Sequence, residues 1–379
     1  MKCVAPVVPL QSERDCLSRS RVRKPMAQDL ATAAVGAFRL TCRWPWASGG
    51  EKLAWSWFSA AAAETAALHR GRFCFCPLPV CRLIAAVHWP KVSLIGVGLL
   101  GGSLGLALRQ RQLAGEVVGF VRRRVSVIEC ERSGAVSRAT LDLADAVRDA
   151  DLIVLCTPLG QMKPLVKAML PHLQRGVVVT DVGSVKGSVV RELEPLLARA
   201  GARLVASHPM AGSEKAGVSA AREDLFDGAV CVVTPTARTQ PDALRKVEAL
   251  WRAVGSLVLR MDAAAHDRAV SRSSHLPHAV ASAVAHWVLD PRQPLEVAQL
   301  CAGGFRDTSR IASSSPEMWR DIALANRKNL ARQLGGLAKS LLQLQRLLQA
   351  GDVAGVETFY RTAKERRDAW LVNSALPAP

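Results

Sequence analysis

The chain has 379 residues, 49% of them hydrophobic and 22% charged, which is enough for two domains with buried cores and excludes a largely disordered protein. No apolar run approaches the roughly 20 residues of a membrane-spanning helix, so we expect no membrane association. The formal charge of +18 comes from scattered basic residues without an aromatic-interleaved stripe, so we expect an anionic small substrate and no nucleic-acid partner.

Residues 1–88 differ from the rest of the chain in composition and in their lack of a regular hydrophobic period. They hold twelve Lys and Arg against five Asp and Glu, and beyond a possible helix over 59–68 they show no sustained strand or helix period. Their apolar segment lies far from the first residue and is interrupted by Glu64, which excludes a secretory signal and leaves an organelle leader as an alternative. We expect a poorly ordered basic extension whose removal leaves activity and stability unchanged.

A glycine-rich turn follows a short apolar strand that begins near residue 91, and it opens a helix. Gly96, Gly98 and Gly101 have the G-x-G-x-x-G spacing. In this motif the first glycine permits a tight turn, the second lets a pyrophosphate approach the backbone, and the third lets the helix pack closely on the strand. The free N–H groups at the helix start favour an anion. We therefore predict a dinucleotide site formed by these glycines with Leu99 and Leu100.

Short apolar runs then alternate with helical stretches up to residue 260, the pattern of parallel strands joined by crossover helices. The runs are Val117–Phe120, Leu152–Cys156, Val177–Thr180, Leu204–Ala206 and Val230–Val233. The sequence predicts a doubly wound, Rossmann-type α/β cofactor domain over residues 89–260. Thr157 and Pro158 follow the second run at its carboxyl end, where open α/β sheets bind ligands, so we expect them beside the cofactor.

The residues after Phe120 bear on the choice of cofactor. A site for NAD places an acidic residue here, about 20 residues beyond the glycines, to hold the ribose 2′-hydroxyl, whereas an arginine accommodates the 2′-phosphate of NADP. This chain has Val121 followed by Arg122 and Arg123. The sequence favours NADP over NAD, with the two arginines as phosphate ligands, and the alternative is a solvated basic turn.

Two polar segments, Thr180–Gly187 and Ser207–Gly217, each follow a predicted strand and should lie on the ligand side of the sheet. His208 suits acid/base chemistry because its ordinary pKa of about 6.5 lets it accept a proton near neutrality. We expect Ser184 and Glu214 to orient it and shape the pocket. No Cys/His spacing resembles a zinc site, so no metal is expected. The widely separated cysteines of this part of the chain indicate the reduced thiols of a cytoplasmic enzyme.

Helical periods replace the strand-like runs from about residue 261 onward, which predicts an all-α domain over residues 261–379. One long helical stretch, His266–Leu289, is broken by Pro277, and another, Pro316–Ala350, carries leucines at helical spacing. These leucines are typical of a core or a subunit interface: Leu330, Leu334, Leu337, Leu341, Leu344 and Leu348.

Two polar groups in this half are possible ligand contacts. His275 and His278 lie three residues apart and would share a helix face; a structural pair is the default, because a third metal ligand is missing. Gly303–Arg310 begins with a flexible turn and presents Arg306 and Arg310, whose planar guanidinium forks suit carboxylate recognition. Ordinary surface arginines are the alternative.

Several of these segments, in this order, resemble the prephenate/arogenate dehydrogenase family, the cyclohexadienyl dehydrogenases of tyrosine biosynthesis. The resemblance covers residues 91–370, about three quarters of the chain, and leaves residues 1–88 outside. The matching segments are Gly96–Ser103, Asp181–Lys186, Ser207–Glu214, Ser274–His278 and Gly303–Ala312.

The resemblance implies an oxidative decarboxylation of prephenate, with transfer of a hydride to the nicotinamide. His208 would accept the proton of the ring hydroxyl, Ser184 would assist there, and Arg310 would grip a substrate carboxylate. A helical dimerisation domain, and hence a homodimer, is also implied. Further residues that the resemblance places at the substrate are Ser274, His275, His278, Glu214 and, more weakly, His266. Trp319 matches a position near the pocket, with core packing as the alternative.

Other functions stay open at this point. An arogenate or dual-specificity cyclohexadienyl dehydrogenase differs only in the substrate side chain, which a single charged pocket residue can select. A β-hydroxyacid dehydrogenase also joins a dinucleotide domain to a helical one, but the lysine expected on its helical half has no matching motif here. A cofactor-sensing module would bind the cofactor without turnover.

Overall fold

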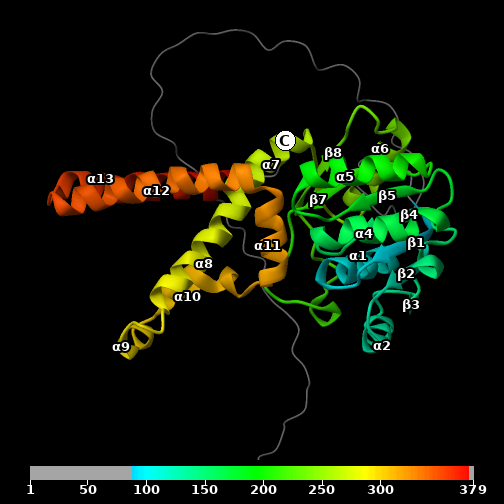
Figure 1. Ribbon diagram of the computed structural model, residues 1–379, viewed down its shortest axis with the longest axis horizontal. Coiled ribbons are helices and arrows are strands. Elements are labelled where there is room, and N and C mark those ends of the chain that lie inside the picture. The colour runs from blue at the N-terminus through cyan, green and yellow to red at the C-terminus, as the bar shows by residue number, and fades with distance from the viewer. Residues whose placement is uncertain (1–87, 375–379) are drawn as a thin grey trace, which may run out of the picture. The chain divides into compact units, whose positions relative to one another are not determined.

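The computed structural model describes residues 88–374, and the expected basic extension therefore lies outside the described residues except for His88. The described part holds an α/β region followed by a helical region (Figure 1). The last strand of the α/β region ends at Arg260, and the first helix of the helical region begins at Ala263.

The α/β region is built on a six-stranded parallel sheet with the strand order β3-β2-β1-β4-β5-β6. This order is that of a doubly wound dinucleotide-binding fold, whose ligand crevice lies at the carboxyl ends of the central strands. The strands are β1 Trp89–Ile95, β2 Ala114–Phe120, β3 Arg138–Thr140, β4 Leu152–Leu155, β5 Val178–Asp181 and β6 Arg203–Leu204. The connecting helices are α1 Leu99–Gln110, α2 Arg124–Arg132, α3 Leu143–Val147, α4 Leu159–Met169 and α5 Lys186–Arg199.

Alternate residues of the central strands enter two different hydrophobic clusters. Leu94 and Val154 belong to one cluster, and Ile95 and Ile153 belong to the other, and all four are fully buried. Because successive side chains of a strand point to opposite faces, the sheet is covered on both faces, as a parallel sheet requires.

A second, three-stranded sheet follows, and the sequence did not predict it. It has the order β7-β8-β9, with β7 Ala206–Pro209 antiparallel to β8 Val230–Thr234, and β8 parallel to β9 Leu257–Arg260 across helix α6 Pro241–Ala253. The predicted single strand over 204–206 is in fact divided at Val205, where the chain passes from one sheet to the other. His208 therefore lies within β7, paired with Val232, and not beyond a strand end.

The helical region contains two long hairpin helices and several short ones (Figure 1). Its elements are α7 Ala263–Val270, a π-helical turn Ser271–His275, α8 Leu276–Val288, α9 Leu295–Gln299, α10 Gly303–Ser309, a 3₁₀ turn Arg310–Ser313, α11 Pro316–Ala325, α12 Arg327–Gln349 and α13 Val353–Ser374. The segment expected as a flexible turn at Gly303 is helix α10. Pro277 lies in the first turn of α8, which continues directly from the π-helical turn Ser271–His275, so the helical stretch runs through this proline.

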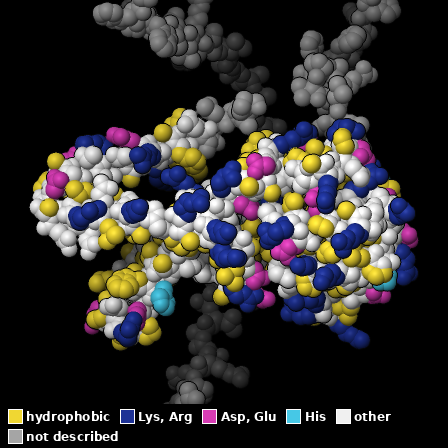
Figure 2. Space-filling model, turned by 45° about the horizontal axis from the view of Figure 1, so that its top comes forward, with side chains coloured by type: hydrophobic (Ala, Val, Ile, Leu, Met, Phe, Trp, Pro, Cys, Tyr) yellow, Lys and Arg dark blue, Asp and Glu magenta, His cyan; other side chains and the backbone are white. Residues whose placement is uncertain are grey.

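The predicted leucine stripe of α12 is only partly covered within the chain. Leu330 is buried, whereas Leu334, Leu341 and Leu348 are 40%, 57% and 58% exposed. None of the helices between residues 88 and 374 combines the length and apolar character that a membrane crossing requires. Figure 2 shows Lys and Arg side chains spread over the whole face in view, without a single stripe.

Candidate active site

A cavity of about 780 Å³ lies at the carboxyl ends of the parallel strands, between the α/β region and helices α8 and α11. Most of the predicted site residues line it: Gly98, Leu99, Leu100, Thr157, Pro158, Ser184, His208, Glu214, Ser274, His278 and Arg310, together with Trp319. Gly96, Gly101, Arg122, Arg123, His266 and His275 are absent from the lining.

The three glycines of the turn after β1 differ in what surrounds them. Gly96 has a φ of +98°, and a Cβ there would meet Thr157 Cγ2 at 2.9 Å, while a Cβ on Gly101 would collide with the Gly96 carbonyl oxygen. Gly98 has no heavy atom within 4 Å of such a Cβ, so the space above it is open. Gly96 and Gly101 therefore shape the turn, and Gly98 leaves room for a ligand.

This open space fits the pyrophosphate of a dinucleotide. Helix α1 begins at Leu99 with Gly98 as its N-cap, and no side chain caps its free N–H groups. A helix start with open space above a glycine is a favourable place for a phosphate. The Thr157 hydroxyl oxygen is buried there without a hydrogen-bond partner among the described residues, so a polar group is available to a bound ligand.

Arg122 and Arg123 lie between β2 and α2, and both are exposed. Arg123 is the N-cap residue of α2 and its side chain makes no capping hydrogen bond. The preceding Val121 is buried, so it holds the chain in place but offers no polar group to a ribose.

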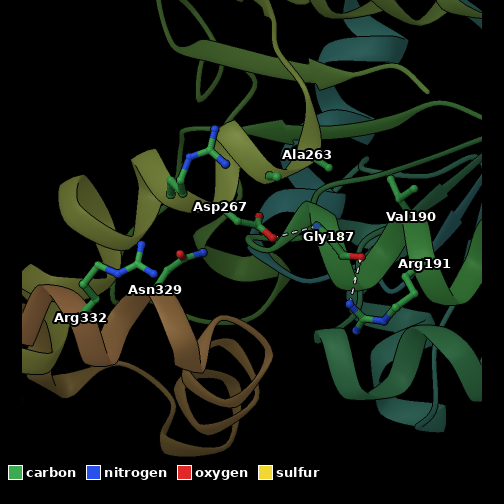
Figure 3. Close-up of a pocket in the computed structure, with 9 residues that line it drawn as sticks. Gly187, Val190, Arg191, Ala263, Asp267, Asn329 and Arg332 are labelled. Carbon is green, nitrogen blue, oxygen red and sulfur yellow. Dashed lines mark hydrogen bonds between the residues drawn. The ribbon is translucent and has the colours of Figure 1, made fainter. Parts of the chain in front are cut away.

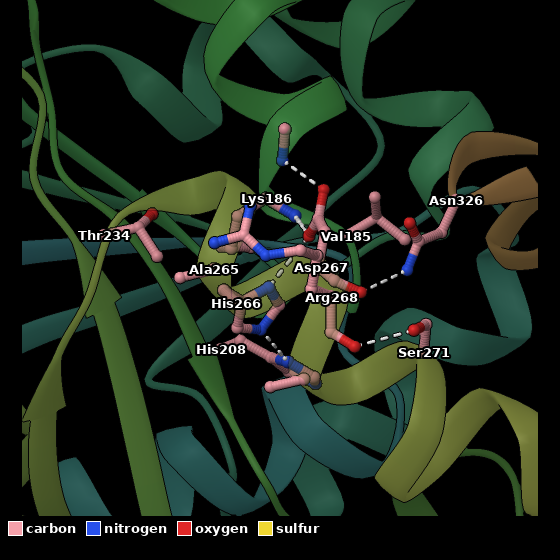
Figure 4. Close-up of polar contacts among 12 residues, drawn as sticks. Val185, Lys186, His208, Thr234, Ala265, His266, Asp267, Arg268, Ser271 and Asn326 are labelled. Atoms are coloured by element: carbon pink, nitrogen blue, oxygen red, sulfur yellow. Dashed lines mark hydrogen bonds and ion pairs between the residues drawn. The ribbon is translucent and has the colours of Figure 1, made fainter. Parts of the chain in front are cut away.

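The centre of the site is a hydrogen-bonded row of three side chains, Asp267, His266 and His208 (Figure 4). Asp267 Oδ1 lies 2.9 Å from His266 Nδ1, and His266 Nε2 lies 2.9 Å from His208 Nδ1. A carboxylate accepts, so we assign the proton to His266 Nδ1; His266 Nε2 then accepts from His208 Nδ1–H. This arrangement leaves an unprotonated Nε2 on His208 at the cavity wall.

The surroundings of His208 keep its imidazole neutral. Burial lowers the pKa of His208 well below its ordinary value, and the positive charge of Lys186 and the neighbouring His266 and His275 act in the same direction. A neutral imidazole with a free ring nitrogen is a proton acceptor near neutral pH.

A buried ion pair joins the segment after β5 to strand β7. Lys186 and Asp181 are both fully buried and bonded to each other, and Lys186 Nζ also donates to the Ser207 carbonyl oxygen at 2.6 Å. Asp181 in turn accepts from the N–H groups of Ser207 and Gly183, at 3.1 and 2.9 Å. The pair therefore fixes the segment that carries Ser184 against the strand that carries His208.

A cluster of rings from α8 and α11 forms one wall of the cavity. His278 stacks on Trp319 with 3.7 Å between ring centroids, and its Nδ1 donates to the Ser274 carbonyl oxygen at 3.0 Å. His275 lies behind this wall, where its Nδ1 accepts from Asn326 Nδ2 at 3.2 Å. Burial lowers the pKa of His275 to about 4.

Arg310 and Glu214 meet across the cavity. Arg310 Nη1 donates to Glu214 Oε2 at 2.7 Å, and the Arg310 side chain is 59% exposed. A half-exposed pair of this kind contributes little stability, so its partners are available for other contacts. Arg306 does not line the cavity.

The comparisons with known proteins agree with this geometry. The nucleotide-binding domain family of prephenate dehydrogenase matches residues 104–260, and the prephenate dehydrogenase dimerization domain family matches residues 262–365. Prephenate dehydrogenase of Bacillus subtilis is 31% identical over 292 residues, which cover 76% of this chain and 78% of that protein. The chain belongs to the prephenate dehydrogenase family.

Other members of the family are equally similar. Cyclohexadienyl dehydrogenase of Zymomonas mobilis is 32% identical, over 73% of this chain and 94% of that protein. The crystal structure of Aquifex aeolicus prephenate dehydrogenase with hydroxyphenyl propionate and NAD+ has a TM-score of 0.69 and 33% identity, and covers 74% of this chain and 98% of that one. Synechocystis arogenate dehydrogenase has a TM-score of 0.62 and 30% identity, over 74% of this chain and 99% of that one. This prephenate dehydrogenase family member is an oxidoreductase with a nicotinamide-cofactor domain of Rossmann type and a helical dimerisation domain.

Three residues of the site were not predicted from the sequence. Asp267 follows His266 directly on helix α7, and Asn326 lies at the α11–α12 junction, from which the fold brings it to His275. Lys186 lies in a segment that was recognised, but nothing in its spacing indicated that it is buried beneath His208. Among residues 88–374, no group of three or more His, Cys, Asp or Glu side chains is placed to hold a metal ion.

Proposed function

We propose that this chain is a prephenate dehydrogenase, which converts prephenate to 4-hydroxyphenylpyruvate by oxidative decarboxylation in the synthesis of L-tyrosine. The observation that carries the proposal is the His208 ring nitrogen at the wall of a cavity that also contains the open glycine turn. Relatives with the names prephenate and cyclohexadienyl dehydrogenase support the choice of substrate class.

His208 is the proton acceptor in the proposed reaction. Its Nε2 takes the proton of the C4 hydroxyl of prephenate as the C4 hydride leaves, and the C1 carboxylate departs as CO2 while the ring becomes aromatic. The bound nicotinamide supplies the acceptor for the hydride. His266 and Asp267 stabilise the imidazolium that forms, because a proton gained at Nε2 strengthens the donation from Nδ1 toward His266.

The remaining cavity residues bind and orient the substrate in this proposal. Arg310 exchanges its contact with Glu214 for a substrate carboxylate, which its planar fork binds with two hydrogen bonds. Ser184 assists at the hydroxyl, and Ser274 and His278 shape the wall opposite. His266 and His275 lie behind the cavity lining, so we assign them to positioning.

Two further features of the function are inferred from particular residues. Arg122 and Arg123 favour NADP over NAD, because no acidic side chain follows β2 and both guanidinium groups are exposed there. The exposed leucines of α12 favour a homodimer, and the four unpaired cysteines of the described region favour a cytoplasmic location. Sedimentation at micromolar concentration tests the dimer, and a clean monomer would contradict it.

A four-way initial-rate assay tests the function: prephenate or arogenate, each with NAD or NADP, followed by the absorbance of the reduced nicotinamide. Turnover of prephenate establishes the proposed activity, and faster turnover of arogenate replaces it with arogenate dehydrogenase activity. Equal or better catalytic efficiency with NAD would contradict the assignment of Arg122 and Arg123 as ligands of the 2′-phosphate of NADP. Cofactor binding without any turnover would favour a sensor.

A further inference from the structure

A second cavity, of about 540 Å³, lies where helices α5, α7 and α12 meet. It shares no lining residue with the substrate cavity. Each helix contributes one arginine to it: Arg191 from α5, Arg268 from α7 and Arg332 from α12. Figure 3 shows Arg332 and Asn329 on one side of this space and Arg191 on the other, with Asp267 between them. It therefore lies at the junction of the α/β and helical regions, a frequent place for ligand sites.

The charge around this cavity is positive and only partly neutralised. The side chains of Arg268 and Arg332 form no ion pair within residues 88–374. Arg191 forms an ion pair with Glu192 at 3.3 Å and donates to the Gly187 carbonyl oxygen at 3.5 Å. The carboxylate in the wall, Asp267, already accepts from two backbone N–H groups, at 2.8 and 2.9 Å, and from His266. Three guanidinium groups around a concave surface therefore attract an anion.

The rest of the lining is apolar and indicates the kind of anion. Val190, Ala263 and Ala264 present methyl groups to the space, and Asn329 adds one amide. Guanidinium forks match a carboxylate with two parallel hydrogen bonds, and methyl groups favour an apolar body. The volume is within the range of small-molecule sites.

We propose that this cavity is an effector site for a small organic carboxylate with an apolar body. A ligand there bridges Arg191 of the α/β region to Arg268 and Arg332 of the helical region. Asp267 links the same two regions. It accepts from two backbone N–H groups at the start of α5 and from His266, which in turn contacts His208. A ligand bound in this cavity therefore changes the rate of proton transfer to His208.

Binding is tested with 3-phenylpropionate by calorimetry, in a background of Arg310→Gln that removes the proposed carboxylate anchor of the substrate cavity. We expect one site per chain, weakened at least about tenfold by the pair Arg268→Gln/Arg332→Gln. The matched pair Arg199→Gln/Arg327→Gln removes two arginines outside the cavity, on α5 and α12, and leaves binding unchanged. Absence of binding, equal weakening by both pairs, or equal binding of the neutral 3-phenylpropanol would overturn the site.

The link to catalysis is tested by turnover with the native active site, and this part alone rests on the proposed function. At saturating prephenate, which outcompetes the carboxylate in the substrate cavity, 3-phenylpropionate should change kcat about twofold or more. The same addition should leave kcat of Arg268→Gln/Arg332→Gln unchanged. Binding with an unaltered kcat would overturn the effector role, and an enzyme inactive toward prephenate would refute the proposed function while the calorimetry still decides the site.

Discussion

His208 Nδ1 lies 2.9 Å from Nε2 of His266, and this contact joins the two regions of the chain. His208 belongs to strand β7, whereas His266 and its partner Asp267 belong to helix α7. The proposed base is thus oriented from outside the cofactor-binding region. Its proton-accepting nitrogen faces the cavity only while the α/β and helical regions keep this contact.

Replacement of His208 by Asn should lower kcat by about 10²–10⁴-fold, because the amide cannot take the hydroxyl proton in the transition state. KM for prephenate should change little, since the asparagine fills a similar space and the carboxylate contact at Arg310 is untouched. Steady-state kinetics with prephenate measures both constants. Retained turnover would remove His208 from the mechanism.

Replacement of Asp267 by Asn should also lower kcat strongly, by about 10²–10⁴-fold, because it changes the hydrogen bonds that set the tautomers of His266 and His208 and removes a negative charge beside them. Asp267 Oδ1 contacts both Lys186 N–H and His266 Nδ1, whereas Oδ2 accepts from Gly187 N–H. If the Asn oxygen takes the Oδ1 position, the tautomer is kept but the carboxylate charge that stabilises the imidazolium is lost. If the oxygen keeps Gly187 N–H, the NH2 group faces His266 Nδ1 and Lys186 N–H. His266 would then carry its proton on Nε2, and His208 would accept at Nδ1 and hold its own proton on Nε2. A base protonated at the cavity wall cannot accept from the substrate.

The matched control for this change is Asp262→Asn. Asp262 is the N-cap of the same helix, and its side chain accepts from Ala265 N–H at 2.7 Å and makes no contact with the side chains of Asp267, His266 and His208. Asn caps a helix as well as Asp, so kcat should stay close to wild type. Equal kinetics of the two variants would show that neither the tautomer of His266 nor the charge of Asp267 governs the reaction.

Replacement of Arg310 by Gln should raise KM for prephenate about 10–100-fold, with a smaller effect on kcat, because a charge-assisted contact present in both ground and transition states is lost. Arg306→Gln is the control, since Arg306 lies on the neighbouring helix α10 outside the cavity lining. An unchanged KM in Arg310→Gln would exclude the carboxylate role. A KM raised equally by both changes would indicate a general charge effect.

Local patterns of the sequence predicted most of the α/β region and most of the site residues found in the cavity wall. The glycine turn, with its strand before and helix after, is a contiguous signal, and the apolar runs that became β2, β4, β5 and β8 were visible as hydrophobic periods. Ser184 follows strand β5 at its carboxyl end, as expected, whereas His208 reaches the same cavity from within strand β7.

Features that depend on pairing between distant segments were not visible in the same way. Strand β3 has three residues, and the edge strand β9 leaves Leu257 and Leu259 exposed, so neither shows a buried period. The division of the chain at Val205 depends on which partner each short strand finds, and not on its composition. Asp267 follows His266 directly in the sequence, but its contacts with the start of α5, and the contact of His266 with His208, form only when these distant segments meet.

Burial of His275 as a neutral side chain should make the fold less stable in acid. Only 1% of His275 is exposed; burial lowers its pKa to about 4, with His266 and His278 acting in the same direction and Asp267 opposing them. In the unfolded chain the pKa is about 6.5, so above that pH neither state binds the proton and His275 contributes no pH dependence. As the pH falls below about 6.5, the unfolded state binds a proton that the folded state excludes, and the free energy of unfolding decreases by up to about 1.4 kcal/mol per pH unit until about pH 4.

Urea unfolding at fixed protein concentration between about pH 7 and pH 5 measures this effect. His275→Asn removes the titrating group, so its free energy of unfolding should decrease less steeply with falling pH than that of the wild type, by up to about 1 kcal/mol per pH unit. His286→Asn, at an exposed position of α8, should keep the wild-type slope. The same slope in all three proteins would show that His275 titrates alike in the folded and unfolded chain, which would contradict its burial as a neutral side chain.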